Sequence, residues 1–199
     1  MEYGSRVRFV IFTILALLLL GLSAWGIISL SNRLFGSNQS SQSSAAAKIN
    51  LQDYIKYDTK FSLESQGPVV ADELYVSSVI EVAQDYRQIT IYRGYGKTII
   101  SQKRYENNNA AYDAFVKSLE LVGFSKTIAG ISSNETGNCP TAQRFVYMLN
   151  SGNQKVIRTW STTCSSKAGS FGGNALPTRA LFRAQIPDYL AMTTGLAVQ

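Results

Sequence analysis

The first clear pattern in the sequence is an unbroken apolar stretch near the N-terminus. Residues 9–31 contain no charged side chain, and Arg8 and Arg33 lie close to the two ends of the stretch. About 20 consecutive apolar residues form a helix long enough to cross the hydrocarbon core of a bilayer. A helix in the core of a folded domain would keep a polar face, and this stretch has none. The pattern therefore predicts a transmembrane helix over residues 9–31, with the lipid bilayer as its partner.

The charges beside this helix predict its orientation. Arg6 and Arg8 precede it, whereas only Arg33 follows closely, and positive residues favour the cytoplasmic side. We expect residues 1–8 in the cytoplasm and the remaining chain outside it, so the protein would be a single-pass protein of the cell membrane.

A cleaved signal peptide is the alternative to this anchor. Ser23 and Ala24 would suit a signal peptidase. However, residues 25–30 extend the apolar stretch well beyond that position, and the apolar region of a typical signal peptide is shorter. The sequence therefore favours a membrane anchor that is kept.

A polar stretch separates the anchor from the folded part. Residues 36–47 contain only Gly, Ser, Asn, Gln and Ala, so they cannot bury enough apolar surface to offset the entropy of ordering. We predict a flexible tether over residues 32–50. Residues 51–71 mix aromatic and charged side chains, which leaves open a membrane-proximal helix or an arm that packs on the domain. The folded domain is expected over residues 72–199.

Alternating apolar and polar residues predict the strands of this domain. One strand begins near Leu74, because apolar residues recur there with a period of two. A hairpin follows, in which residues 87–93 and 97–105 flank a Gly-Tyr-Gly turn at 94–96, whose glycines tolerate positive φ. In this register Ile91 would face Ile99.

A helix and a second hairpin come next. Asn108 or Asn109 is a suitable N-cap and Gly123 a suitable C-terminal glycine. Residues 144–149 and 154–161 then flank a four-residue turn, so that Phe145 would face Arg158.

The same register, extended, places Cys139 directly opposite Cys164. Residues opposed across two strands have Cβ atoms close enough for a disulfide after modest adjustment. The two cysteines have neither a CxxC spacing nor enough thiolates for a zinc site, so we predict a disulfide between Cys139 and Cys164. Pro177 suits the first turn of a last helix, which would run to about Gln185. The order strand, hairpin, helix, hairpin, helix predicts an α+β domain with one antiparallel sheet.

Composition excludes several classes of protein. The chain contains no histidine, which excludes Ser-His-Asp and Cys-His catalysis and every zinc site with a His ligand. The net charge is +6, but three arginines flank the predicted anchor, and the remaining excess is too small to imply nucleic acid. Gly96-Lys97-Thr98 lies in a hairpin and lacks the first glycine of a phosphate-binding loop. We therefore expect no nucleotide, metal or cofactor.

One cluster of side chains is a candidate binding site. The first hairpin interleaves cations with tyrosines and contains no acid between Asp85 and Glu106. Such mixtures suit an anionic polymer or glycan, although charges on a hairpin also discourage edge-to-edge association. The candidate residues are Arg87, Tyr92, Arg93, Tyr95, Lys97, Lys103 and Arg104.

Several short motifs resemble those of a known group of proteins. They are Cys139-Pro140-Thr141, Trp160 to Cys164, Phe171-Gly172-Gly173, and Gln185 to Tyr189. Over residues 72–195 the chain resembles small membrane-anchored proteins of unassigned function from reduced-genome bacteria of the Saccharibacteria type. The resemblance implies a bacterial envelope setting and carries no catalytic residues.

These observations favour a non-enzymatic, membrane-anchored, extracytoplasmic domain that binds or docks a partner in the cell envelope. That partner would be an anionic envelope polymer or a membrane protein. The alternatives are an envelope enzyme of an unrecognised type that lacks a catalytic histidine, and a scaffold subunit of a membrane assembly.

Overall fold

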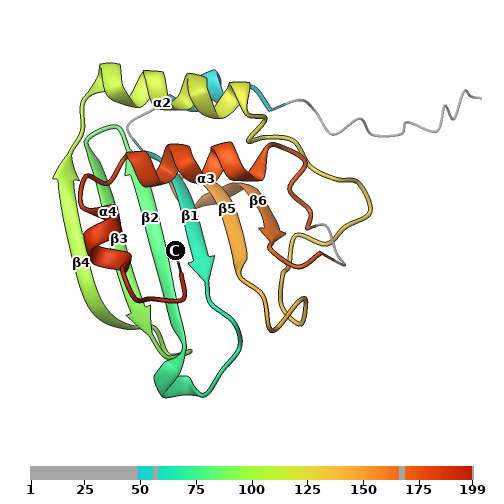
Figure 1. Ribbon diagram of the computed structural model, residues 1–199. Coiled ribbons are helices and arrows are strands. Elements are labelled where there is room, and N and C mark those ends of the chain that lie inside the picture. The colour runs from blue at the N-terminus through green and yellow to red at the C-terminus, as the bar shows by residue number, and fades with distance from the viewer. Residues whose placement is uncertain (1–48, 56–57, 166–168, 199) are drawn as a thin grey trace, which may run out of the picture. The chain divides into compact units, whose positions relative to one another are not determined.

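Six strands form one antiparallel sheet in the order β4-β3-β2-β1-β5-β6 (Figure 1). The computed structural model describes residues 49–55, 58–165 and 169–198. The strands are β1 (Thr59–Gln66), β2 (Val76–Ala83), β3 (Tyr86–Arg93), β4 (Thr98–Glu106), β5 (Arg144–Ser151) and β6 (Gln154–Thr162). The predicted antiparallel sheet is thus confirmed.

The predicted membrane anchor and most of the predicted tether lie outside the described residues. Within the described ranges, every helix is too short or too polar to cross a bilayer. The orientation and the extracytoplasmic location therefore stay predictions.

Helices cover one face of the sheet. The helical segments are η1 (Leu51–Tyr54), η2 (Asp72–Leu74), α2 (Asn109–Leu121), α3 (Ala175–Ala184) and α4 (Tyr189–Thr193). Figure 1 shows α3 in front of the strands and α2 beside it. Phe115 of α2 contacts both Phe182 of α3 and Phe61 of β1, so the two helices share one core. The side chain of Asn108 accepts a hydrogen bond from the backbone N–H of Ala111, and Gly123 follows the C-cap with φ +79°. Both predicted ends of α2 are therefore confirmed, whereas α4 was not expected.

The core lies between this sheet face and the helices. Phe61 of β1 is fully buried, and its ring centroid lies 6.2 Å from that of Tyr112, 6.1 Å from that of Phe115 and 5.6 Å from that of Phe124. Because side chains alternate along a strand, Leu63 points to the same face and is also buried. The aromatic side chains of α2 thus pack on the middle of the sheet.

The domain begins earlier than residue 72. Residues 51–71, set apart in the sequence-based boundaries, supply η1 and the whole of β1. β1 pairs with β2 on one side and with β5 on the other, so it is a central strand. Phe61 and Leu63 alternate with polar residues, as in the other strands, but the polar positions Ser62 and Glu64 are buried as well. Nothing in the sequence indicates that burial, which is why the expected boundary is wrong.

The register predicted for the first hairpin is wrong. Ile91 faces Ser101, and Ile99 faces Tyr92. A register shift between Ile91 and Tyr92 adds a residue on β4, and the turn also includes Lys97, whose φ is +55°. As a result, Ile99 does not join the core and is 55% exposed.

The register of the second hairpin also differs from the prediction. Phe145 faces Ser161, and Arg158 faces Met148. The cause is that Asn150 and Ser151 belong to β5 rather than to the turn, and that the register shifts between Leu149 and Asn150. The turn therefore contains only residues 152 and 153.

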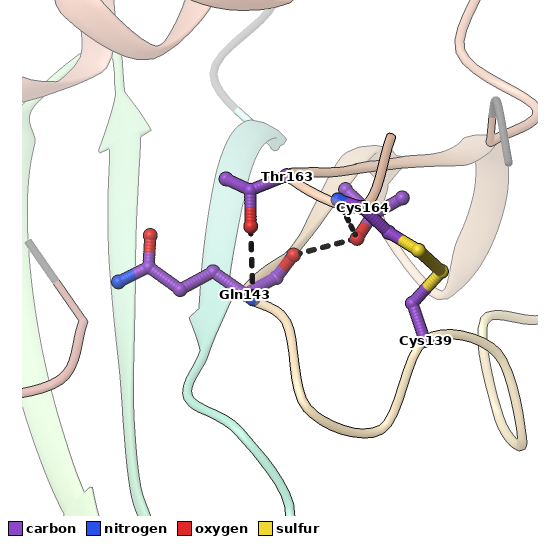
Figure 2. Close-up of a disulfide and its surroundings, with 5 residues drawn as sticks. Cys139, Gln143, Thr163 and Cys164 are labelled. Carbon is purple, nitrogen blue, oxygen red and sulfur yellow. Dashed lines mark hydrogen bonds between the residues drawn. A yellow bond between two sulfur atoms is a disulfide. The ribbon is translucent and has the colours of Figure 1, made fainter. Parts of the chain in front are cut away.

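The predicted disulfide between Cys139 and Cys164 is nevertheless present, with 6.0 Å between the Cα atoms. The cysteines are not opposed within the ladder, because Arg144 pairs with Thr162 and this register would place residue 142 opposite Cys164. The hydrogen bonds nearest to the disulfide join Gln143 to Thr162 and Thr163 (Figure 2). The N–H of Gln143 donates to Oγ1 of Thr163 over 3.2 Å, and its carbonyl accepts from Oγ1 of Thr162 over 2.8 Å. A turn at residues 139–142 then brings Cys139 back to Cys164.

Candidate functional site

The first hairpin does not present its basic residues as one surface. In the strand register Arg87 lies opposite Val82 and Tyr105, and Lys103 lies opposite Ile89. Because Val82 and Ile89 are core residues, the side chains of Arg87 and Lys103 point toward the helix-covered face. Strand alternation sends Tyr92 and Arg104 to the opposite face. The cluster expected from the sequence is therefore divided between the two faces of the sheet.

Three of its cations already have carboxylate partners within the domain. Lys97 pairs with Glu64 over 2.8 Å, Lys103 pairs with Asp188, and Arg104 lies 3.6 Å from Asp85. The guanidinium of Arg104 also lies 3.7 Å from the ring centroid of Tyr86. An external anion would have to compete with these pairs, which weakens the hairpin as a binding surface.

The tyrosines of the hairpin contribute to its internal structure. Tyr95 stacks on Tyr75 with 4.2 Å between ring centroids, and its hydroxyl donates to the carbonyl of Val70 over 2.8 Å. Its backbone N–H donates to Asp72. Tyr92 lies 5.7 Å from Nζ of Lys97. Arg93 is exposed at the end of β3 and has no carboxylate within ion-pair distance among the described residues.

A hydrogen-bonded network crosses the face of the sheet opposite the helices. Lys97 and Gln66 both donate to Oε1 of Glu64, and Gln66 also lies 3.0 Å from Oε1 of Glu135. Arg158 completes the chain with 2.6 Å to Oε2 of Glu135. Burial raises the pKa of Glu135, but its backbone hydrogen bond, Arg158 and Gln66 outweigh burial and hold that pKa below 4.5. Because its charges are paired internally, this network is suited to holding the loop 125–143 against the sheet.

A second candidate site is a groove along α3, whose two arginines have no carboxylate partner among the described residues. The side chains of α3, the following turn and the start of α4 form a groove of about 810 Å³. Its lining consists of Leu176, Pro177, Arg179, Ala180, Arg183, Ile186, Pro187, Tyr189 and Leu190. This volume falls within the range of small-molecule sites, about 300–1,000 Å³. We refer to these nine residues as the α3 groove.

Arg179 and Arg183 are the charged residues of the α3 groove. They are four residues apart on α3 and therefore share one face of the helix. Neither has a carboxylate within ion-pair distance in the part of the chain that the structure describes. The Nε atoms of both are buried and lack a hydrogen-bond partner there. Because these Nε atoms are buried, an anion in the groove could be bound only by the terminal nitrogens of the two guanidinium groups.

Aromatic rings hold these guanidinium groups in place. Arg179 lies 4.1 Å from the ring centroid of Phe145, and Arg183 lies 5.2 Å from that of Tyr189. Burial lowers the pKa of Arg179, but a guanidinium remains protonated at any physiological pH. The pair therefore presents two permanent positive charges with planar donors, which suit a carboxylate or a phosphate.

The hydroxyl groups near the arginines are poor candidates for catalysis. Burial raises the pKa of Tyr147 and that of Tyr189 above the usual value of 10.0. The hydroxyl of Tyr147 also lies 2.8 Å from Oγ of Ser161. Both tyrosines stay protonated at neutral pH. No group of three acidic or cysteine side chains within the described ranges could hold a metal ion.

Sequence reasoning missed the α3 groove. The sequence shows the i, i+4 spacing that places Arg179 and Arg183 on one face of the predicted helix. The contribution of Tyr189 and Leu190 could not be predicted, because it depends on the turn at Pro187 that brings α4 beside α3.

No protein-family model matches this chain, and no curated protein matches its sequence. The resemblance to small envelope proteins therefore stays a prediction.

Proposed function

We propose that the protein is a non-catalytic binding domain, held outside the cytoplasm by its N-terminal anchor, that takes an anionic ligand in the α3 groove. The observation that carries this proposal is the pair Arg179 and Arg183, whose charges have no carboxylate partner within the described residues. An anion that bridges the terminal nitrogens of the two guanidinium groups would supply the negative charge that these residues lack. Hydrogen bonds between ionised groups are about twice as strong as neutral ones.

The α3 groove is favoured over the first hairpin for an energetic reason. An anion at Lys97, Lys103 or Arg104 would have to displace or share an existing carboxylate partner. Binding at Arg179 and Arg183 requires neither. Arg93 also has no carboxylate partner among the described residues, but it offers only a single charge at the end of β3. The groove also places apolar side chains, such as that of Ile186, beside the two charges.

The location is supported by the sequence and by the disulfide. The apolar stretch at residues 9–31 and the arginines before it favour an anchor with an extracytoplasmic domain. The bond between Cys139 and Cys164 is of the kind that persists in oxidising compartments. An envelope protein with this arrangement would meet anionic polymers, glycans and lipids.

The test is retention of the detergent-solubilised full chain on immobilised dextran sulfate at near-physiological salt. The double variant Arg179→Gln/Arg183→Gln should lose at least about tenfold in affinity, because two charged hydrogen-bond donors are removed. The matched control is Arg93→Gln/Lys155→Gln, which removes the same charge from two exposed positions, one of them on the first hairpin. It should bind within about twofold of the wild type.

Equal losses in the two double variants would mean that only net charge matters, and would overturn the proposal. A larger loss in the control than in the groove variant would return the binding site to the hairpin. Far-UV circular dichroism of each variant shows whether the fold is kept, and all four substituted side chains are at least partly exposed.

A further inference from the structure

Two exposed leucines stand at the rim of the α3 groove. Leu176, in the first turn of α3, is 72% exposed, and Leu190, in α4, is 73% exposed. Single exposed apolar residues are common on protein surfaces. These two differ from scattered ones because they line the same groove as Arg179 and Arg183.

The groove therefore combines two kinds of surface. Its charged part is the arginine pair, and its rim offers apolar side chains together with Pro177 and Pro187. A fully hydrated anion would use the first and gain nothing from the second. A ligand with an anionic head and an apolar body would use both.

We propose that the α3 groove binds the phosphate headgroup of an anionic membrane lipid, with Leu176 and Leu190 entering the interfacial region of the bilayer. This inference rests on the proposed function and names its ligand. Guanidinium groups form paired hydrogen bonds to phosphate oxygens. Apolar side chains that flank basic residues are the usual means by which proteins settle on an anionic membrane surface.

A nearby acid does not oppose this assignment. Asp188 lies between Pro187 and Tyr189 of the groove, but its carboxylate accepts hydrogen bonds from Lys103 and from the hydroxyl of Tyr105. Its bond to Lys103 is the main reason why the pKa of Asp188 lies below its usual value. The negative charge of Asp188 is thus matched by Lys103, and the charges of Arg179 and Arg183 remain for the lipid.

The predicted anchor favours a lipid over a soluble anion or an acidic protein. The flexible tether predicted for residues 36–47 would span about 20 Å on average. A domain held at such a distance meets the bilayer surface at a high effective concentration. Even a weak headgroup site would then be occupied.

The experiment places an environment-sensitive fluorophore at the rim of the groove. The full chain carrying Leu190→Cys is labelled without reductant, so that Cys139 and Cys164 stay paired, and is reconstituted in nanodiscs. One set contains phosphatidylcholine alone and the other contains added phosphatidylglycerol. The matched control is Leu121→Cys, because Leu121 on α2 is also exposed, at 87%, and does not line the groove.

We expect the label at residue 190 to shift to the blue, and to be quenched by lipid-borne quenchers, when phosphatidylglycerol is present. The shift should be small in phosphatidylcholine and should be lost when Arg179→Gln/Arg183→Gln is added. The label at residue 121 should not respond. These four results together would support the lipid site.

Other outcomes would overturn it. If dextran sulfate is retained through the two arginines while the label at residue 190 stays in water, the proposed function stands and the lipid assignment fails. If inorganic phosphate then displaces dextran sulfate, and chloride at the same ionic strength does not, the result points to a soluble phosphate. If phosphate does not displace it, the result points to an acidic macromolecule. A blue shift that survives loss of both arginines would show insertion without headgroup recognition, and would also refute the assignment.

Discussion

Glu135 is a nearly buried carboxylate, 6% exposed, that holds the loop 125–143 against β1 and β6. Its contacts with Arg158 and Gln66 favour the ionised form and keep its pKa below 4.5 in the folded protein. The unfolded chain therefore binds a proton at Glu135 at a higher pH than the folded chain does. The stabilisation from Glu135 is present above the unfolded pKa and is lost as the pH falls through the folded pKa.

We therefore predict that acid destabilises the wild type more than the Glu135→Gln variant. At pH 7 the substitution should lower the free energy of unfolding by about 1–3 kcal/mol, because Arg158 loses its carboxylate partner and keeps only the carbonyl of Ser133. Between pH 7 and pH 3 the difference should shrink. Urea titrations of the full chain, followed by circular dichroism, measure both quantities.

The control for this prediction is Glu73→Gln. Glu73 is exposed in η2 and has no hydrogen bond or ion pair to another described side chain, so its loss should leave the pH dependence of the wild type. A Glu135→Gln variant with the same pH dependence as the wild type would show that the network contributes nothing to stability.

At the scale of elements, Gly173 lies in the loop before α3 and packs against the residues that follow α2. A Cβ atom at this position would lie 2.4 Å from the carbonyl oxygen of Gly123 and 2.7 Å from the ring of Phe171. Gly173→Ala should therefore force the two segments apart and destabilise the full chain by about 1–3 kcal/mol. The measurement is again urea unfolding.

Gly96→Ala is the matched substitution in the first hairpin. A Cβ atom there would meet no atom within 4 Å, and the position has no left-handed φ. This variant should unfold within about 0.5 kcal/mol of the wild type. Equal effects at Gly96 and Gly173 would mean that the contact between α2 and the loop is loose.

The elements show how far local sequence determines this fold. The ends of α2 could be predicted because Asn108 and Gly123 act within a few residues of themselves. The strand registers could not, since the irregularities at Ile91 and Leu149 depend on tertiary packing. β1 was missed because Glu64 finds its partner Lys97 far along the chain, which makes a charged residue acceptable in a central strand. The α3 groove was missed because it requires the turn between two helices.

At the scale of the whole molecule, location and function depend on each other. The proposed lipid headgroup site would be useful only where the domain faces a bilayer, and the predicted tether requires that residues 9–31 cross that bilayer. The described domain contributes one independent constraint, the disulfide between Cys139 and Cys164. Cytoplasmic thiols are kept reduced, whereas extracytoplasmic ones are oxidised. The redox state of the two cysteines in the cell therefore tests the side of the membrane.

We predict that both cysteines resist alkylation when cells are lysed in denaturant with a maleimide reagent and no reductant. After reduction both should react, which gives two adducts per chain. The variant Cys139→Ser/Cys164→Ser supplies the blank. It should also unfold at lower urea, because a bond that closes a loop with a sequence separation of 25 residues stabilises the folded state by about 3 kcal/mol. Two adducts without reductant would place the domain in the cytoplasm and would contradict the orientation inferred from Arg6 and Arg8.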